Sequence, residues 1–273
     1  MRIAAGVEYC GTKFYGWQKQ TRSRTVQQCI ENAFSKVANH AITVQCAGRT
    51  DSGVHAFNQV IHFDTTSIRE NHSWIFGANS NLPEDVNVTW VKQVNDEFHA
   101  RFSAFSRQYK YIILNRPARS SVLGNLTSWQ VEHLDDVLMS ESAKYLIGKH
   151  DFTSFRATAC QSKSPIRVIE YLSVKRHDEL IIIDVKANAF LHHMVRNIAG
   201  VLIHVGNKKY PATWVKDVLQ ARDRKRGGIT APASGLYLIK VNYPDEFNIP
   251  SSPNCISNEF LQILFNHLVV NRE

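Results

Sequence analysis

One short polar segment holds the residues best suited to chemistry. It lies between two expected strands and has the sequence Gly48-Arg-Thr-Asp-Ser-Gly-Val-His-Ala56. Asp-Ser-Gly alone is typical of a turn, because aspartate caps backbone amides and glycine adopts positive φ. Here Arg49, Thr50 and His55 accompany Asp51 in a loop that apolar strands hold in place, where functional residues concentrate. The segment therefore predicts a site built on a carboxylate with a cation close by.

Six segments, in chain order, resemble the motifs of the tRNA pseudouridine synthase A family. Gly48–Ala56 resembles the family signature, in which this aspartate is the essential catalytic residue. The others are Tyr9–Gln18, Arg101–Ile112, Asp151–Arg156, Phe190–Asn197 and Ala233–Leu238. The likeness runs from about residue 3 to residue 250. Ser52 departs from it, since the family usually has alanine there, and the segment after Ser251 matches no motif.

The resemblance implies isomerisation of uridine to pseudouridine in the anticodon stem-loop of tRNA, at positions 38, 39 and 40. The N-glycosidic bond breaks, the uracil rotates, and a carbon of the base rejoins the ribose. No redox change or group transfer occurs, so no cofactor is expected. A carboxylate below the sugar can stabilise an oxocarbenium-like centre or attack it, as in glycoside hydrolysis. The sequence leaves both routes open.

The resemblance also assigns roles to individual residues. Asp51 is the catalytic carboxylate and Arg196 its ion-pair partner. Tyr109 stacks on the uracil and relays a proton through its hydroxyl, and Leu236 forms an apolar wall of the pocket. The target base must be flipped out of its stack, and Arg49 is the candidate to fill the space it leaves. Without the family, Tyr109 is a half-buried strand residue and Arg196 a surface arginine on a helix.

The segment after the first strand combines basic and aromatic residues. We expect it to face RNA through four weaker tRNA contacts, Lys13, Lys19, Arg22 and Arg24, interleaved with Phe14, Tyr15 and Trp17. The alternative is a structural aromatic cluster fringed by solvated lysines.

Charge is unevenly distributed along the 273 residues. Residues 1–100 hold nine basic and nine acidic side chains, whereas residues 101–240 hold 22 basic and 11 acidic ones. The last 33 residues hold one basic and four acidic side chains. A basic excess in one half suits a polyanionic partner, because each phosphate neutralised releases counterions. From charge alone, the alternative of a solvated surface that only keeps the protein soluble stays open.

Hydrophobic periodicity predicts an α+β fold of two β-α-β-β-α-β-like halves with their sheets packed side by side. The resemblance implies the pseudouridine synthase fold, in which largely antiparallel sheets flank a central basic cleft. Residues 1–100 form the half with the aspartate loop, 101–250 the basic half, and 251–273 an appended helix. Helices are expected at 25–39, 68–78, 134–147, 192–205 and 213–221. Strands are expected at 2–9, 42–47, 60–64, 86–94, 108–114, 166–175, 180–186 and 236–241.

Other classes receive less support. Cysteines at 10, 29, 46, 160 and 255 show no metal or disulfide spacing, and a reducing cytoplasm is expected. His192 and His193 suggest a metal, but neighbours on a helix diverge and no carboxylate stands at ligand spacing, so no metal is predicted. Neither a signal peptide nor a membrane span is expected. The resemblance implies a homodimer, because the family is homodimeric.

Two alternative functions remain. One is a non-catalytic RNA-binding protein on the same fold, and the other is a glycosidase, which would need a second carboxylate paired with the first.

Overall fold

The computed structural model describes residues 1–158 and 160–250. The helix expected within 251–273 lies outside the described residues. In the part described, the strands are β1 (Arg2–Tyr9), β2 (Gln45–Cys46), β3 (His55–Asp64), β4 (Val86–Val94), β5 (Ser106–Asn115), β6 (Ser128–Gln130), β7 (Gly148–Asp151), β8 (Ile166–His177), β9 (Leu180–Ala187) and β10 (Leu236–Asn242).

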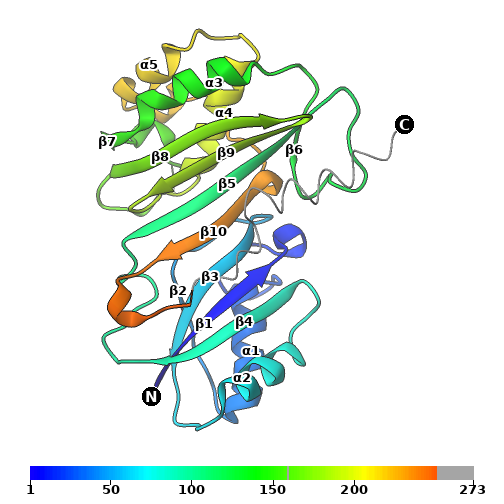
Figure 1. Cartoon of the computed structure of the whole chain (residues 1–273), viewed down its shortest axis with the longest axis vertical. Coiled ribbons are helices and arrows are strands. Elements are labelled where there is room, and N and C mark those ends of the chain that lie inside the picture. The colour runs from blue at the N-terminus through cyan, green and yellow to red at the C-terminus, as the bar shows by residue number, and fades with distance from the viewer. Residues whose placement is uncertain (159, 251–273) are drawn as a thin grey trace.

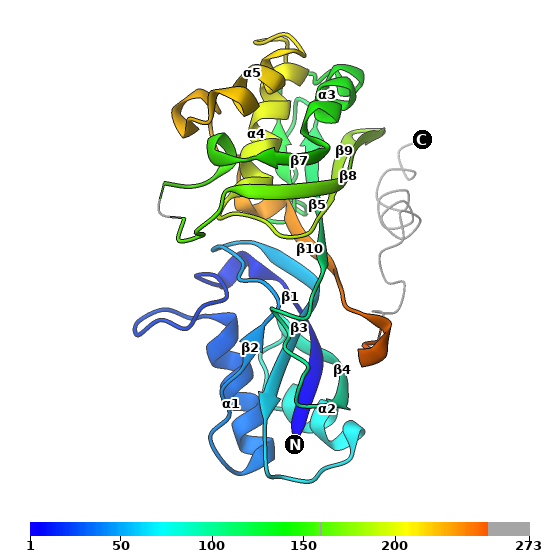
Figure 2. The same cartoon turned by 90° about the vertical axis from the view of Figure 1, so that its left-hand side faces the viewer.

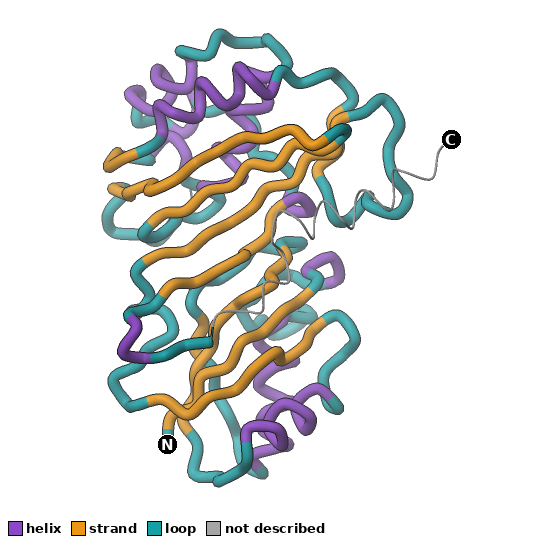
Figure 3. Tube along the Cα trace, in the orientation of Figure 1, coloured by secondary structure: helices purple, strands orange, loops and turns teal. Residues whose placement is uncertain are grey.

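These strands form one continuous sheet, as Figures 1 and 3 show. Its order is β4-β1-β3-β10-β5-β9-β8-β7, with β2 added to β3 and β6 to β5. Pairing is antiparallel except between β3 and β10 and between β5 and β6. The predicted sheets of the two halves are therefore joined edge to edge. The last strand, β10, returns between β3 and β5, a junction that we call the seam.

Helices pack near both ends of this sheet. They are α1 (Val26–Ala38), α2 (Asn71–Asn79), α3 (Asp136–Ala143), α4 (Met194–Gly206) and α5 (Trp214–Ala221). Figure 2 shows α1 and α2 beside the strands of the first half, and α3, α4 and α5 beside those of the second. Short 3₁₀ turns occupy Gly11–Lys13, Lys144–Leu146, Thr153–Phe155, Arg224–Arg226, Ala233–Gly235 and Asp245–Phe247.

The long α1 helix illustrates how the sequence specifies these elements. Val26, Ile30 and Phe34 form its apolar stripe and are completely buried. The helix begins after Thr25 and ends at Asn39, which takes the left-handed conformation typical of a C-terminal cap. The Thr25 side chain makes no hydrogen bond to the amides of the first turn, so it does not cap the helix. The helix therefore depends on its buried stripe rather than on that cap.

Most of the other expected elements are confirmed within a few residues. The strand 86–94 and the β8–β9 hairpin are present as expected. The expected strand 42–47 was too long, because only Gln45–Cys46 pairs with β3. The short strands β6 and β7 were not predicted, since three or four residues carry too little alternation to be recognised.

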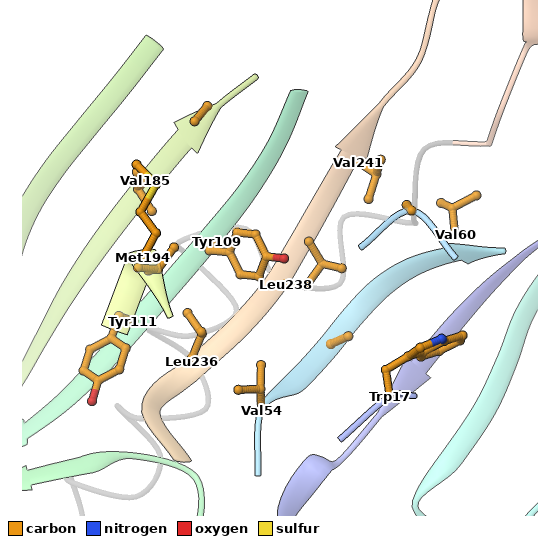
Figure 4. Close-up of a cluster of buried hydrophobic side chains, with 14 of the residues drawn as sticks. Trp17, Val54, Val60, Tyr109, Tyr111, Val185, Met194, Leu236, Leu238 and Val241 are labelled. Atoms are coloured by element: carbon orange, nitrogen blue, oxygen red, sulfur yellow. The ribbon is translucent and has the colours of Figure 1, made fainter. Parts of the chain in front are cut away.

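The main core runs through both halves on the side of the sheet that the helices cover. Alternation along β5 shows the two faces, because Tyr111 and Ile113 belong to this core, whereas Ile112 and Leu114 join a smaller cluster with Tyr237. Figure 4 shows core side chains gathered where β5, β10 and β3 meet. The seam is thus a packed part of the fold. Within residues 1–158 and 160–250, no helix is long and apolar enough to cross a membrane.

Candidate active site

The loop that carries Asp51 connects β2 to β3 and is held by main-chain hydrogen bonds. The Trp17 amide donates to the Thr50 carbonyl at 3.0 Å. The Phe14 carbonyl accepts from the Ser52 hydroxyl at 3.1 Å and from the Gly53 amide at 3.3 Å. The two residues flanking Asp51 are therefore bonded to the N-terminal segment, which fixes where the carboxylate points.

Gly16 allows this close approach. Its φ is +89°, and a Cβ there would lie 2.8 Å from the Thr50 carbonyl oxygen. Any other residue would be strained in its backbone and would collide with the loop. The segment Tyr9–Gln18, which resembles a family motif, thus supports the aspartate loop directly.

The aromatic residues of the segment expected to face RNA divide into two groups. Phe14 and Trp17 are buried in the core, so for these two the alternative of a structural aromatic cluster is confirmed. Tyr15 alone of the three is exposed. Exposed Lys13 and Arg22 flank this region of the chain.

Two of the four basic residues of this segment are engaged within the protein. Arg24 makes two hydrogen bonds to the Asp85 carboxylate, at 2.7 and 2.8 Å, and lies over the Phe14 ring. Lys19 pairs with Glu31 at 3.1 Å. Both positive charges are therefore partly neutralised before any RNA phosphate arrives, so Lys13 and Arg22 are the stronger candidates for RNA contact.

Arg196 comes from α4 and reaches Asp51 across the seam. Its Nη1 lies 3.1 Å from Asp51 Oδ2, and its Nε donates to the Ala231 carbonyl at 2.9 Å. The two side chains retain only 16% and 21% exposure. The next residue, Asn197, is completely buried and donates to the Phe155 carbonyl at 2.6 Å. This bond anchors the first turn of α4, so the guanidinium is presented by a fixed helix.

His192 and His193 also contact Asp51, and sequence reasoning missed this. His192 Nε2 is 3.1 Å from Oδ1, and His193 Nε2 is 3.3 Å from Oδ2. Burial lowers the pKa of His193 below its ordinary value, against the opposing effect of Asp51. The argument used against a metal was wrong in two respects, since the pair precedes α4 instead of lying on it, and a carboxylate is adjacent in space. Their spacing three and four residues before Arg196 was the available signal.

Tyr109 and Leu236 lie on neighbouring strands at the seam, where Leu238 is directly opposite Tyr109 (Figure 4). Tyr109 pairs in register with Leu238 of β10, so Leu236, two residues earlier, shares its face of the sheet. Both side chains are largely buried, and the Tyr109 ring meets Phe190 edge-on at 5.0 Å. Burial raises the pKa of Tyr109, and the charge of Asp51 acts in the same direction. The hydroxyl therefore stays protonated at neutral pH and can donate.

Two further arginines have contrasting positions. Arg49 is exposed, two residues before Asp51. Arg107 is buried and donates to the carbonyls of Ala47, Ala104, Asn188 and Arg101, at distances of 2.6 to 3.1 Å. Since Ala47 begins the aspartate loop, Arg107 ties that loop to the second half. Sequence reasoning did not predict this role, because an arginine that donates only to backbone carbonyls has no partner residue at a recognisable spacing.

Comparison with known proteins gives one consistent result. A family model described as tRNA pseudouridine synthase matches residues 5–103 and 142–244. A tRNA pseudouridine synthase A of Nitrosococcus oceani is 54% identical over 250 residues, which cover 92% of this chain and 96% of that protein. Proteins of the same description from Legionella pneumophila and Vibrio vulnificus are 55% and 54% identical, covering 91% and 92% of this chain and 95% of each relative.

Proposed function

The chain belongs to the tRNA pseudouridine synthase family, and on that premise we propose that it isomerises uridine to pseudouridine in tRNA. Following the resemblance of its motifs, its targets are uridines 38, 39 and 40 of the anticodon stem-loop. One observation carries the proposal most directly. Arg196 and Asp51, 145 residues apart in the chain, form an ion pair at 3.1 Å beside a buried tyrosine.

The chemistry assigned to Asp51 follows from this environment. The Arg196 guanidinium stabilises the charged carboxylate, which is the form that can oppose positive charge at C1′ of the ribose. As the bond from C1′ to N1 of uracil breaks, Asp51 either stabilises the sugar cation or bonds to it. The base then rotates, C5 bonds to C1′, the C5 proton is lost, and N1, which kept the electron pair of the broken bond, takes up a proton. Atoms and electrons balance without any cofactor.

The uracil would be held on the second half of the site. Tyr109 offers a ring backed by Phe190, and stacking of a base on an aromatic ring contributes about 1–3 kcal/mol. Its protonated hydroxyl can donate to the base, and Leu236 supplies an apolar wall beside it. Arg49, exposed beside the acid, is the residue we assign to the stack that the flipped base leaves.

Recognition of the tRNA would use shape and phosphates. Residues 101–240 carry 22 basic and 11 acidic side chains, an excess of 11, which suits phosphate contacts more than base readout. We also propose that the enzyme is a cytoplasmic homodimer and that residues 1–100 and 101–250 act as two halves around the site. The family-model match to residues 5–103 and 142–244 supports that division.

The test is Asp51→Asn, which removes the charge with little change of shape. We expect turnover, measured by tritium release from C5-labelled uridine in tRNA, to fall by at least about 10³-fold, because charge development is no longer opposed. Affinity for tRNA in filter binding should be retained. Asp64→Asn is the matched control, since Asp64 pairs with Arg2 far from the seam, and it should remain active. Full activity of Asp51→Asn would contradict the mechanism, and an inactive wild type that binds tRNA would favour the non-catalytic RNA-binding protein.

A further inference from the structure

Three metal-ligating side chains converge in the candidate site. One ligand atom each from Asp51, His192 and His193 lies within 4.8 Å of the others. The two imidazoles approach different oxygens of the same carboxylate, at 3.1 and 3.3 Å. Their ring centroids are only 4.0 Å apart. Two imidazoles and one carboxylate therefore place their ligand atoms in one small region.

The backbone explains why two adjacent histidines can point the same way. His193 adopts a left-handed conformation with φ of 61° just before α4 begins. A residue other than glycine takes this conformation at an energetic cost, and histidine is among the residues that adopt it more often than most. His193 is thereby turned toward Asp51 beside His192, instead of diverging from it as neighbours on a helix do.

The separations suit a small divalent cation. A tetrahedral zinc ion with ligands at about 2.0–2.1 Å has ligand atoms about 3.3–3.4 Å apart. The distance of 3.1 Å from His192 Nε2 to Asp51 Oδ1 is close to that edge, and the three ligand atoms all lie within 4.8 Å of one another, so a cation could enter after side-chain shifts. A set of two nitrogens and one oxygen favours zinc and its transition-metal neighbours over magnesium or calcium, which prefer oxygen ligands.

We propose that Asp51, His192 and His193 form a reversible inhibitory binding site for Zn²⁺. The inhibition, though not the binding, rests on the proposed function, because the metal would occupy the carboxylate that the isomerisation needs free. Zinc and the ribose of the target uridine would compete for Asp51. The enzyme is therefore expected to be most active in the presence of a chelator.

Arg196 limits how tightly the metal is held. Its Nη1 lies 3.1 Å from Oδ2, and this positive charge opposes a second cation nearby. Oδ1 contacts His192 and not the guanidinium, which makes Oδ1 the better oxygen for the metal. His192 is the most exposed of the three ligands, with 44% of its side chain accessible, so exchange with solvent should be fast. We expect micromolar binding instead of the permanent occupancy of a structural zinc site.

The decisive experiment measures Zn²⁺ binding to the full chain without tRNA, by competition with a chromogenic chelator. Wild type should bind one equivalent at this site, and His192→Ala and His193→Ala should each bind at least about tenfold more weakly. His177→Ala, at the β8–β9 turn, is the matched histidine control and should not change affinity. Cys160→Ser separates thiol binding from the proposed site, because Cys160 is a free cysteine in the same half.

Two further readouts complete the test. Co²⁺ should give the intense visible absorption of a four-coordinate nitrogen and oxygen site, which the histidine variants lack. Zn²⁺ should inhibit pseudouridine formation by wild type, and chelator should restore it. Unchanged affinity in the double variant His192→Ala/His193→Ala, or loss of binding in Cys160→Ser, would overturn the proposal. Failure of the proposed function is distinguished by absent turnover in chelator alone, whatever the metal result.

Discussion

The two halves of the molecule hold their parts of the candidate site by different means. In the first half, residues 1–100, Asp51 sits on a loop whose neighbours bond to the main chain of Phe14 and Trp17. In the second half, residues 101–250, Arg196 is presented by a helix fixed through buried side chains such as Asn197. Main-chain bonds thus supply part of the support for the acid, together with the side chains of Ser52 and Arg107, whereas the helix that carries its cation depends on buried side chains.

This difference predicts where the site tolerates change. Main-chain bonds survive most side-chain substitutions, apart from those at a glycine that allows close approach, such as Gly16. The second half depends on particular groups, since the Asn197 side chain also accepts from Arg224 and Thr230. Single substitutions near Arg196 should therefore disturb the site more than those around Asp51.

Arg196→Met is the sharpest test of this dependence on one side chain. Turnover should fall by about 10²–10³-fold, because a fixed charge that orients and stabilises the acid is lost. Single-turnover rates and tRNA affinity measured together would separate chemistry from binding. Arg222→Met is the matched control, since Arg222 is exposed and pairs with Asp151 at 3.6 Å. Wild-type turnover in Arg196→Met would mean that the ion pair has no part in catalysis.

Arg107→Met tests the tie between the halves. The substitution leaves four carbonyls without their donor in a buried setting, so the free energy of unfolding should fall by about 3 kcal/mol or more. Urea denaturation would measure the loss. Arg107→Lys keeps the charge but cannot reach all four oxygens, and should recover only part of it. Equal stability of Arg107→Met and wild type would show that the halves are joined by the sheet alone.

Local patterns in the sequence were sufficient for most elements but not for their assembly. The helix at 25–39 and the strands at 166–175 and 180–186 are encoded by neighbouring residues, and all three were predicted. The place of β10 between β3 and β5 depends on pairing with strands more than a hundred residues earlier. No periodicity encodes such a partner, so the single continuous sheet could not be predicted.

The candidate site was likewise predicted only in part. Motif resemblance named Asp51, Tyr109, Arg196 and Leu236, and the structure brings these four to the seam. The histidine pair was considered separately, because its carboxylate lies on a loop about 140 residues away in the chain. Phe14 was predicted to lie on the RNA-facing surface, because an aromatic residue among basic ones looks the same in sequence whether it is buried or exposed.

Two substitutions of Tyr109 can separate the contribution of its aromatic ring from that of its hydroxyl. Tyr109→Phe retains the stacking surface and should lower turnover by about 10²-fold, because proton transfer from a positioned group is lost. Tyr109→Ala should also weaken tRNA binding, since the ring contributes stacking energy. Tritium release and filter binding on both variants would measure the two effects. Tyr171→Phe, at an exposed position of β8, serves as the control. Equal activity of Tyr109→Ala and wild type would exclude this residue from the site.

The smallest expected effect concerns acid stability, and it falls on the first half. Burial lowers the pKa of His62 in β3 from 6.5 to about 4, with His99 and Arg2 acting in the same direction. Below pH 6.5 His62 binds a proton in the unfolded chain, whereas in the folded chain it stays neutral until the pH falls to about 4. Stability is therefore complete above pH 6.5 and declines as the pH falls, by about 2 kcal/mol at pH 5 for this residue.

His62→Asn provides the matched variant, because its amide oxygen can replace Nδ1 as the acceptor for the Ala100 amide but does not titrate. Denaturation of both proteins between pH 7.5 and about 4.5 should show a smaller loss of stability in the variant.

His55 is a second buried histidine of the same kind, with its pKa lowered by burial to about 4, beside Tyr237 at the seam. Hydrogen exchange, corrected for its intrinsic pH dependence, should show β1 and β3 losing protection before the β8–β9 hairpin. Simultaneous loss throughout the sheet would mean that the two halves unfold as one cooperative unit.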